Sequence, residues 1–183
     1  MTIARRIPNK WFWITLLIPV ALLLSLTVQP LQIHWFAEEI AIKTRPYDPK
    51  DLFYGDHVVL HYEIEEIPVS LFEETVIERA KANPARKFAV YVELEKKGDV
   101  HGVKRVVAEQ PDGGTYLKGY LKPFSLDEDN GGLAHVEYKN IGRFYVEEHT
   151  GYDWEEKSRQ GQIYAIVKVY KGAAVLKDIR TSV

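Results

Sequence analysis

The longest pattern in the chain is an apolar run close to its N-terminus. Residues 11–28 are almost purely apolar, interrupted by a few hydroxyl side chains and Pro19, and no formally charged side chain lies between positions 11 and 37. An α-helix rises about 1.5 Å per residue, so about 18–20 apolar residues match a hydrocarbon core of about 30 Å. The pattern therefore predicts a transmembrane helix over residues 11–31, preceded by a basic tail at residues 1–10.

The residues that flank this run predict its orientation. Basic residues precede it, Glu38 and Glu39 follow it, and aromatic side chains lie at both ends, at the level of lipid headgroups. The positive-inside rule then places the N-terminus in the cytoplasm and the remainder of the chain outside. A cleaved signal peptide is the alternative, but the bulky Trp35, two positions before Ala37, does not suit a signal-peptidase site. We therefore expect an uncleaved, single-pass signal anchor.

After the anchor, apolar and polar residues mostly alternate, which is typical of half-buried strands. Strands are predicted at residues 40–44, 56–67, 88–95, 100–108, 115–122, 136–146, 162–170 and 173–179. Two short helices are predicted from capping boxes, one begun by Ser70 and Glu73 and one by Asp153 and Glu156. The expected fold is mainly β, an antiparallel barrel or sandwich with two short helices. A juxtamembrane segment with the first strand would occupy residues 32–45, and the outer β-rich domain residues 46–183.

Two of these strands carry more specific expectations. The strand at 56–67 would place four apolar side chains on one face, namely Val58, Leu60, Tyr62 and Ile64. The strand at 136–146 would continue through Gly142 as a β-bulge. Glycine-containing turns at 97–99 and 171–172 predict hairpins between the strands on either side.

Composition excludes several classes of protein. With 24 basic and 26 acidic side chains the net charge is −2, so the chain lacks the basic surplus of a protein that neutralises nucleic-acid phosphates. The absence of cysteine excludes disulfides, thiolate metal sites and a cysteine nucleophile. A hydrophobic content of 46% is too high for a disordered chain. We expect a folded, anchored domain with no nucleic-acid partner.

Candidate chemistry is sparse. Asp48, Asp51 and Asp56 could form a general acid–base pair or a site for a hard cation, but their spacing does not match a calcium loop, and turn formation explains them more simply. His57 and His61 would lie about 13 Å apart along a strand, too far apart to share one metal ion. No motif for a serine nucleophile occurs. The sequence therefore predicts no catalytic residues, no metal site and no cofactor.

Two segments resemble a known family. The run from Pro46 to Tyr62 is similar to the signature of the GDYXXLXY family, in which Gly55, Asp56, Leu60 and Tyr62 match and His57 stands where the family typically has tyrosine. The run at 141–151 also looks like a segment of that family. The resemblance implies a bacterial, membrane-anchored protein without an assigned activity. Its relatives occur beside, or fused to, multi-pass membrane proteins.

The expected function combines the anchor with this resemblance. We expect a non-enzymatic outer domain at the bacterial plasma (inner) membrane that serves as an accessory or binding subunit of a membrane protein complex. Its partners would be the lipid bilayer, through residues 11–31, and a multi-pass membrane protein. The candidate interaction residues are those of the motif: Asp48, Pro49, Asp51, Gly55, Asp56, Leu60 and Tyr62.

Two alternatives stay open. An envelope sensor domain could bind a cation or a small ligand at the three aspartates of the motif region. A hydrolase resembling type I signal peptidases is the other, although the expected Ser-Met-x-Pro is replaced at residues 45–49 by Arg-Pro-Tyr-Asp-Pro, which contains no serine.

Overall fold

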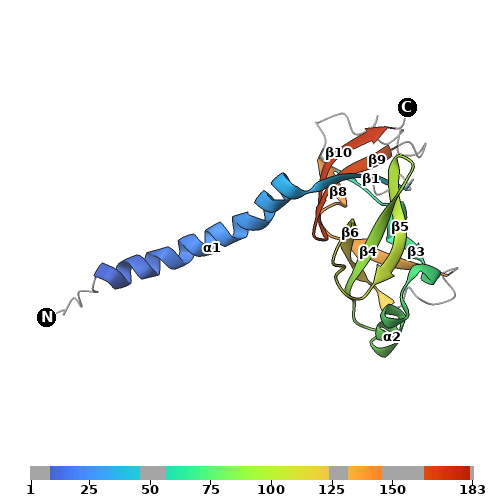
Figure 1. Ribbon diagram of the computed structural model, residues 1–183, viewed down its shortest axis with the longest axis horizontal. Helices are drawn as coiled ribbons and strands as arrows, with labels where there is room; N and C mark the ends of the chain where they lie inside the picture. Colours follow the sequence, from blue (N-terminus) through green and yellow to red (C-terminus); the bar gives the residue numbers. More distant parts are fainter. Residues whose placement is uncertain (1–8, 46–56, 124–131, 146–162, 182–183) are drawn as a thin grey trace.

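The computed structural model describes residues 9–45, 57–123, 132–145 and 163–181. Figure 1 shows one long helix, α1 (Asn9–Phe36), that extends away from a β-rich part and meets it at the last turns of the helix. The apolar stretch Trp13–Phe36 is 24 residues long and its apolar core is not buried by the rest of the protein. One helix of the described chain is therefore long and apolar enough to span a membrane.

The helix continues beyond residue 31, where the apolar run was expected to end, and reaches Phe36. The amide of Ala37 still donates a hydrogen bond to the carbonyl of Ile33, at 3.2 Å. Helical hydrogen bonds join backbone groups, so the polar side chains of Gln32 and His34 do not end the helix, which continues to Phe36. The segment predicted as juxtamembrane therefore contains the last turn of α1 and then the first strand.

The β-rich part contains three antiparallel sheets, which confirms the mainly β fold class. Their strand orders are β1-β9-β10, β2-β8 and β3-β7-β6-β4-β5. The strands are β1 (Glu38–Lys43), β2 (His57–Val59), β3 (Glu66–Pro68), β4 (Phe88–Lys97), β5 (Val100–Val107), β6 (Tyr116–Leu121), β7 (Leu133–Tyr138), β8 (Arg143–Tyr145), β9 (Ile163–Tyr170) and β10 (Ala173–Thr181). The hairpins β4-β5 and β9-β10 are the two predicted from glycine turns.

The prediction of one continuous strand at residues 56–67 is wrong. After β2 pairs with β8, Tyr62 forms a bridge to Thr44, and β3 then pairs with β7. A short 3-10 helix, Glu63–Glu65, separates the two strands. The segment changes partner from one sheet to the next, and the tight 3-10 turn provides the change of direction. The predicted side of the segment still faces the core, because Leu60, Tyr62 and Ile64 are buried.

The strand predicted at 136–146 is wrong for a related reason. Instead of one strand with a bulge at Gly142, the chain forms β7 and β8, which belong to different sheets. Between them Asn140 adopts a φ of 65°, a left-handed conformation that asparagine tolerates better than most residues. A turn there allows the chain to leave the five-stranded sheet.

The capping box predicted at Ser70 is also wrong. Ser70 lies in a 3-10 helix, Val69–Leu71, and helix α2 (Glu74–Ala82) begins only after Phe72 has formed an extended bridge to Val106. The amide of Glu73 donates to the carbonyl of Val106, at 2.9 Å. Pairing with β5 thus delays the start of the helix. The second helix, predicted from Asp153, lies outside the described residues.

A single apolar cluster joins the three sheets and α2. Its largest fully buried side chains include Ile40, Ile42, Tyr62, Ile67, Leu117, Leu121, Ile141 and Ile163. Thr44 is the one buried polar residue of the described chain, and its hydroxyl donates to the carbonyl of Ile163, at 2.6 Å. A buried hydroxyl needs such a partner, because it is costly to remove from water unpaired.

Candidate functional site

The structure describes only the last part of the family motif, residues 57–62. Leu60 and Tyr62 lie in the core, with exposed fractions of 4% and 0%. Their side chains therefore stabilise the fold and cannot contact a partner at the surface. The other candidate interaction residues, Asp48, Pro49, Asp51, Gly55 and Asp56, lie outside the described residues.

Tyr62 is held by polar contacts as well as by packing. Its hydroxyl donates a hydrogen bond to the carbonyl of Ile141, at 2.5 Å, and its backbone forms the bridge to Thr44. Burial, and to a lesser extent the nearby charge of Glu65, raises the pKa of the Tyr62 phenol well above its ordinary value. The phenol is therefore a neutral hydrogen-bond donor at physiological pH.

The two segments that resemble the family are neighbours in space. The amide of Leu60 donates to the carbonyl of Gly142, at 2.9 Å, and the strands pair with Val59 opposite Arg143. Together with the Tyr62–Ile141 hydrogen bond, these contacts bind residues 57–62 to residues 141–145. The end of the motif thus holds the small β2-β8 sheet against the rest of the domain.

His61, the other polar side chain at the end of the motif, contacts a carboxylate. Its Nδ1 lies 3.1 Å from Oε2 of Glu65, and the Glu65 side chain is largely buried. The side chain of His57 is outside the described part of the structure. Among the described residues, no group of three or more potential metal ligands gathers in one place.

Three carboxylates of the described chain are poor general acids, because basic neighbours lower their pKa values. Hydrogen bonds from Lys177, Arg105 and Lys87 lower the pKa of Glu39, Glu93 and Glu137, respectively. Glu93 is the most enclosed of these: Arg105 Nη2 lies 2.7 Å from its Oε1, and the same guanidinium contacts Glu73 at 3.2 Å. A carboxyl group with a lowered pKa is ionised near neutral pH and cannot donate a proton there.

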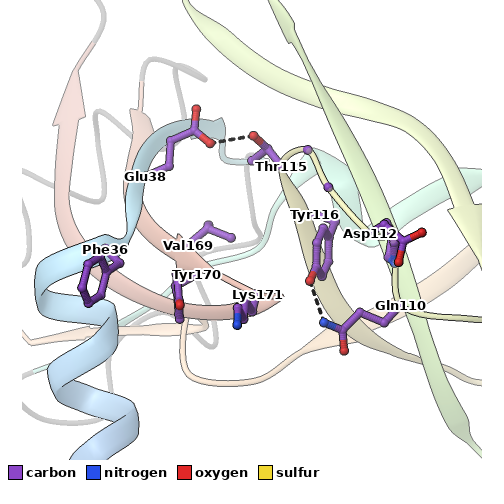
Figure 2. A pocket seen from close by; sticks show the side chains of 12 residues that line it. Phe36, Glu38, Gln110, Asp112, Thr115, Tyr116, Val169, Tyr170 and Lys171 are labelled. Carbon is purple, nitrogen blue, oxygen red and sulfur yellow. Dashed lines mark hydrogen bonds between the residues drawn. The ribbon is translucent and has the colours of Figure 1, made fainter.

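A hollow lies between the end of α1 and the β-rich part, and we call it the junction groove. It has a volume of about 510 Å³ and is lined by the end of α1, by residues 110–116 and by the β9-β10 turn. Figure 2 shows Phe36, Tyr170 and Lys171 along one side and Tyr116 with Gln110 along the other.

Specific contacts hold the junction groove together. The rings of Phe36 and Tyr170 lie 6.1 Å apart between centroids. Thr115 Oγ1 donates to Glu38 Oε2 at 2.7 Å, so the residues just after α1 are tied to the loop that precedes β6. The sequence marks Phe36 only as an aromatic residue at the end of the apolar run, and nothing in its pattern places Thr115 or Tyr170 beside it.

Comparison with known proteins gives one result. The family model described as GDYXXLXY protein matches residues 19–179. Searches of curated proteins and of solved structures found no significant match. The matched range runs from within α1 to β10 and includes both segments that meet at Tyr62 and Ile141. The chain belongs to the GDYXXLXY protein family.

Proposed function

We propose that the protein is a single-pass membrane protein whose β-rich domain acts as an accessory or binding subunit of a membrane protein complex. The observation that carries the proposal is the exposure of α1. Large apolar side chains along it are open on all sides, among them Leu17, Leu22, Leu23, Leu24 and Leu26. Exposure of so much apolar surface to water is unfavourable by about 25 cal/mol per Å². Lipid, or the helices of another protein, must cover it.

The charges on both sides of α1 support an orientation. Arg5, Arg6 and Lys10 precede the apolar stretch, and Glu38 and Glu39 follow it. With basic residues on the cytoplasmic side, the β-rich domain faces outward, which in a bacterium is the periplasmic side of the inner membrane.

The contacts at the end of α1 support a positioning role. Ile33 is buried against the domain, Phe36 contacts Tyr170, and β1 begins at Glu38, directly after the helix. A domain connected in this way cannot swing freely on a linker. It keeps a fixed place above the bilayer, where it can meet an extramembrane loop of a multi-pass partner in the junction groove.

Site-specific photo-crosslinking in native membranes tests this proposal. A photoreactive residue at Leu17 or Leu24, which are 66% and 64% exposed, should yield a discrete crosslink to one multi-pass protein. The same residue at the buried Ile33 is the matched control, and it should crosslink within the chain. A tagged full chain extracted in mild detergent should recover the same partner in stoichiometric amount. A monomer without crosslinks at either exposed position would contradict the proposal.

A further inference from the structure

A second hollow combines aromatic side chains with positive charge, and we call it the lysine pocket. It has a volume of about 280 Å³, and its charged and aromatic lining consists of Tyr91, Lys118, Tyr120, Tyr138, Lys139 and Lys171. Its described lining contains three lysines and no carboxylate. These residues come from β4, β6, the end of β7 with the turn after it, and the β9-β10 turn.

The charge of the three lysines is not neutralised within the described part of the chain. There, none of their ammonium groups lies within 4.0 Å of a carboxylate, whereas the nearby Lys87 and Lys122 share Glu137 at 3.2 and 3.9 Å. Lys139 Nζ lies 4.6 Å from the centroid of the Tyr120 ring. A concave surface lined by one sign of charge concentrates ions of the opposite sign.

The pocket is built on a fixed turn. The amide of Lys118 donates to the carbonyl of Gly172, at 2.9 Å, which docks the β9-β10 turn on β6. Lys171 and Gly172 have φ angles of 49° and 81°, as a tight hairpin turn requires. Lys171 is therefore held on the same side of β6 as Lys118, and little ordering is needed when an anion binds.

The lysine pocket lies next to the end of α1. Lys171 lines both this pocket and the junction groove, and the adjacent Tyr170 contacts Phe36, the last residue of the helix. Figure 2 shows Tyr170 and Lys171 beside Phe36. When α1 spans the bilayer, Phe36 and Trp35, which is 73% exposed, lie at the level of the headgroups. Lys171, which follows Tyr170 directly, then lies close to the layer of lipid phosphates, and Lys118 and Lys139 line the same pocket.

We propose that the lysine pocket binds the headgroup of an anionic phospholipid in the leaflet next to the domain; this rests on the proposed anchoring by α1. Lysine is a strong point-charge ligand for phosphate. The hydroxyl of Tyr120 or Tyr91 and the amide of Asn140 are hydrogen-bonding groups that suit a glycerol or an ester oxygen beside the phosphate. Bound lipid would fix the tilt of the domain on the membrane.

The test uses the full chain in neutral detergent, titrated with fluorescent phosphatidylglycerol and, separately, fluorescent phosphatidylcholine. Wild type should bind phosphatidylglycerol more tightly. The variant K118Q/K139Q should weaken that binding roughly ten- to thirty-fold and leave phosphatidylcholine binding unchanged. The control K81Q/K96Q removes the same charge at exposed lysines outside the pocket and should bind like wild type. The proposal would be overturned if both variants weakened phosphatidylglycerol binding equally, or if neither variant weakened it.

Two further arms separate the sources of the phosphate and the two proposals. If inorganic phosphate or glycerol phosphate binds wild type as tightly as the lipid does, with the same dependence on Lys118 and Lys139, the pocket serves a soluble anion and the lipid proposal fails.

Carbonate extraction of native membranes tests α1 alone. If the protein stays in the membrane but its lipid preference does not depend on the lysines, only the lipid site is refuted. If carbonate extracts the protein, the anchor is refuted. Thermal unfolding of both variants close to wild type confirms that each is folded.

Discussion

The hydroxyl of Tyr62 donates a hydrogen bond to the backbone carbonyl of Ile141 across 79 positions of sequence, inside the apolar cluster that joins the three sheets. Tyr62 is the last residue of the family motif, and Ile141 begins the second segment that resembles the family. The contact is a structural explanation for the motif: its final tyrosine secures the chain where it passes between sheets.

Replacing Tyr62 by phenylalanine should destabilise the domain. The change leaves the carbonyl of Ile141 buried without this donor, at a cost of about 1–3 kcal/mol. Denaturant unfolding of the full chain in detergent, followed by near-ultraviolet circular dichroism, measures the loss. The control is Tyr164→Phe, at a partly exposed tyrosine of β9, which should change the free energy of unfolding by less than about 0.5 kcal/mol. Equal effects of the two substitutions would show that the Tyr62 hydrogen bond contributes nothing specific.

Two tyrosines with enclosed, hydrogen-bonded hydroxyls, Tyr62 and Tyr138, should make the domain sensitive to alkaline pH. Burial raises the pKa of Tyr62 and of Tyr138 above the ordinary value of about 10. Above that pH the unfolded chain loses these protons while the folded chain retains them, so the free energy of unfolding must fall as pH rises. We expect full stability below about pH 10 and a steady decline above it. Unfolding curves at pH 9 and pH 11 measure this loss of stability. The variant Tyr62→Phe should lose less stability between the two pH values than wild type. An equal loss in the variant would show that other groups cause the pH dependence.

Gly172→Ala should disturb the turn that carries Lys171. Gly172 has a φ of 81°, and an added Cβ would lie 3.0 Å from the ring of Tyr116. The matched control is Gly98→Ala, where φ is 67° but an added Cβ meets nothing within 4 Å. Both substitutions carry the left-handed strain of about 1 kcal/mol, and only Gly172→Ala adds a tight contact, with the ring of Tyr116. Its thermal midpoint should therefore fall further than that of Gly98→Ala, and equal shifts would show that Tyr116 moves aside freely.

The orientation of α1 can be tested with the charges before it. Alkaline phosphatase fused after Val183 should be active if the β-rich domain lies outside the inner membrane. Replacing Arg5, Arg6 and Lys10 by glutamine removes the basic flank and should lower that activity, because these residues retain the N-terminus in the cytoplasm. The variant K81Q/K96Q, far along the sequence from α1, serves as a control and should leave activity unchanged. An inactive wild-type fusion would contradict the orientation.

Much of the local structure follows from the sequence. The apolar run predicts α1, and the alternating segments around Gly98 and Gly172 predict the β4-β5 and β9-β10 hairpins. In these elements the residues that determine the conformation are close together along the chain: the turn glycine and the strands on either side of it. The burial of Leu60, Tyr62 and Ile64 was predictable as well, because the period of two persists even where the strand is interrupted.

Outside these two hairpins, the tertiary structure alone decided which strands pair and which side chains meet between the sheets. The predicted strands at 56–67 and 136–146 are each divided because their two halves pair in different sheets. Likewise, Lys118, Lys139 and Lys171 are ordinary polar positions in the sequence and become one pocket only when the β9-β10 turn docks on β6. Alternation fixes which side of a strand faces the core. It carries no information about the partner strand, because pairing depends on hydrogen bonds and packing between residues far apart in the chain.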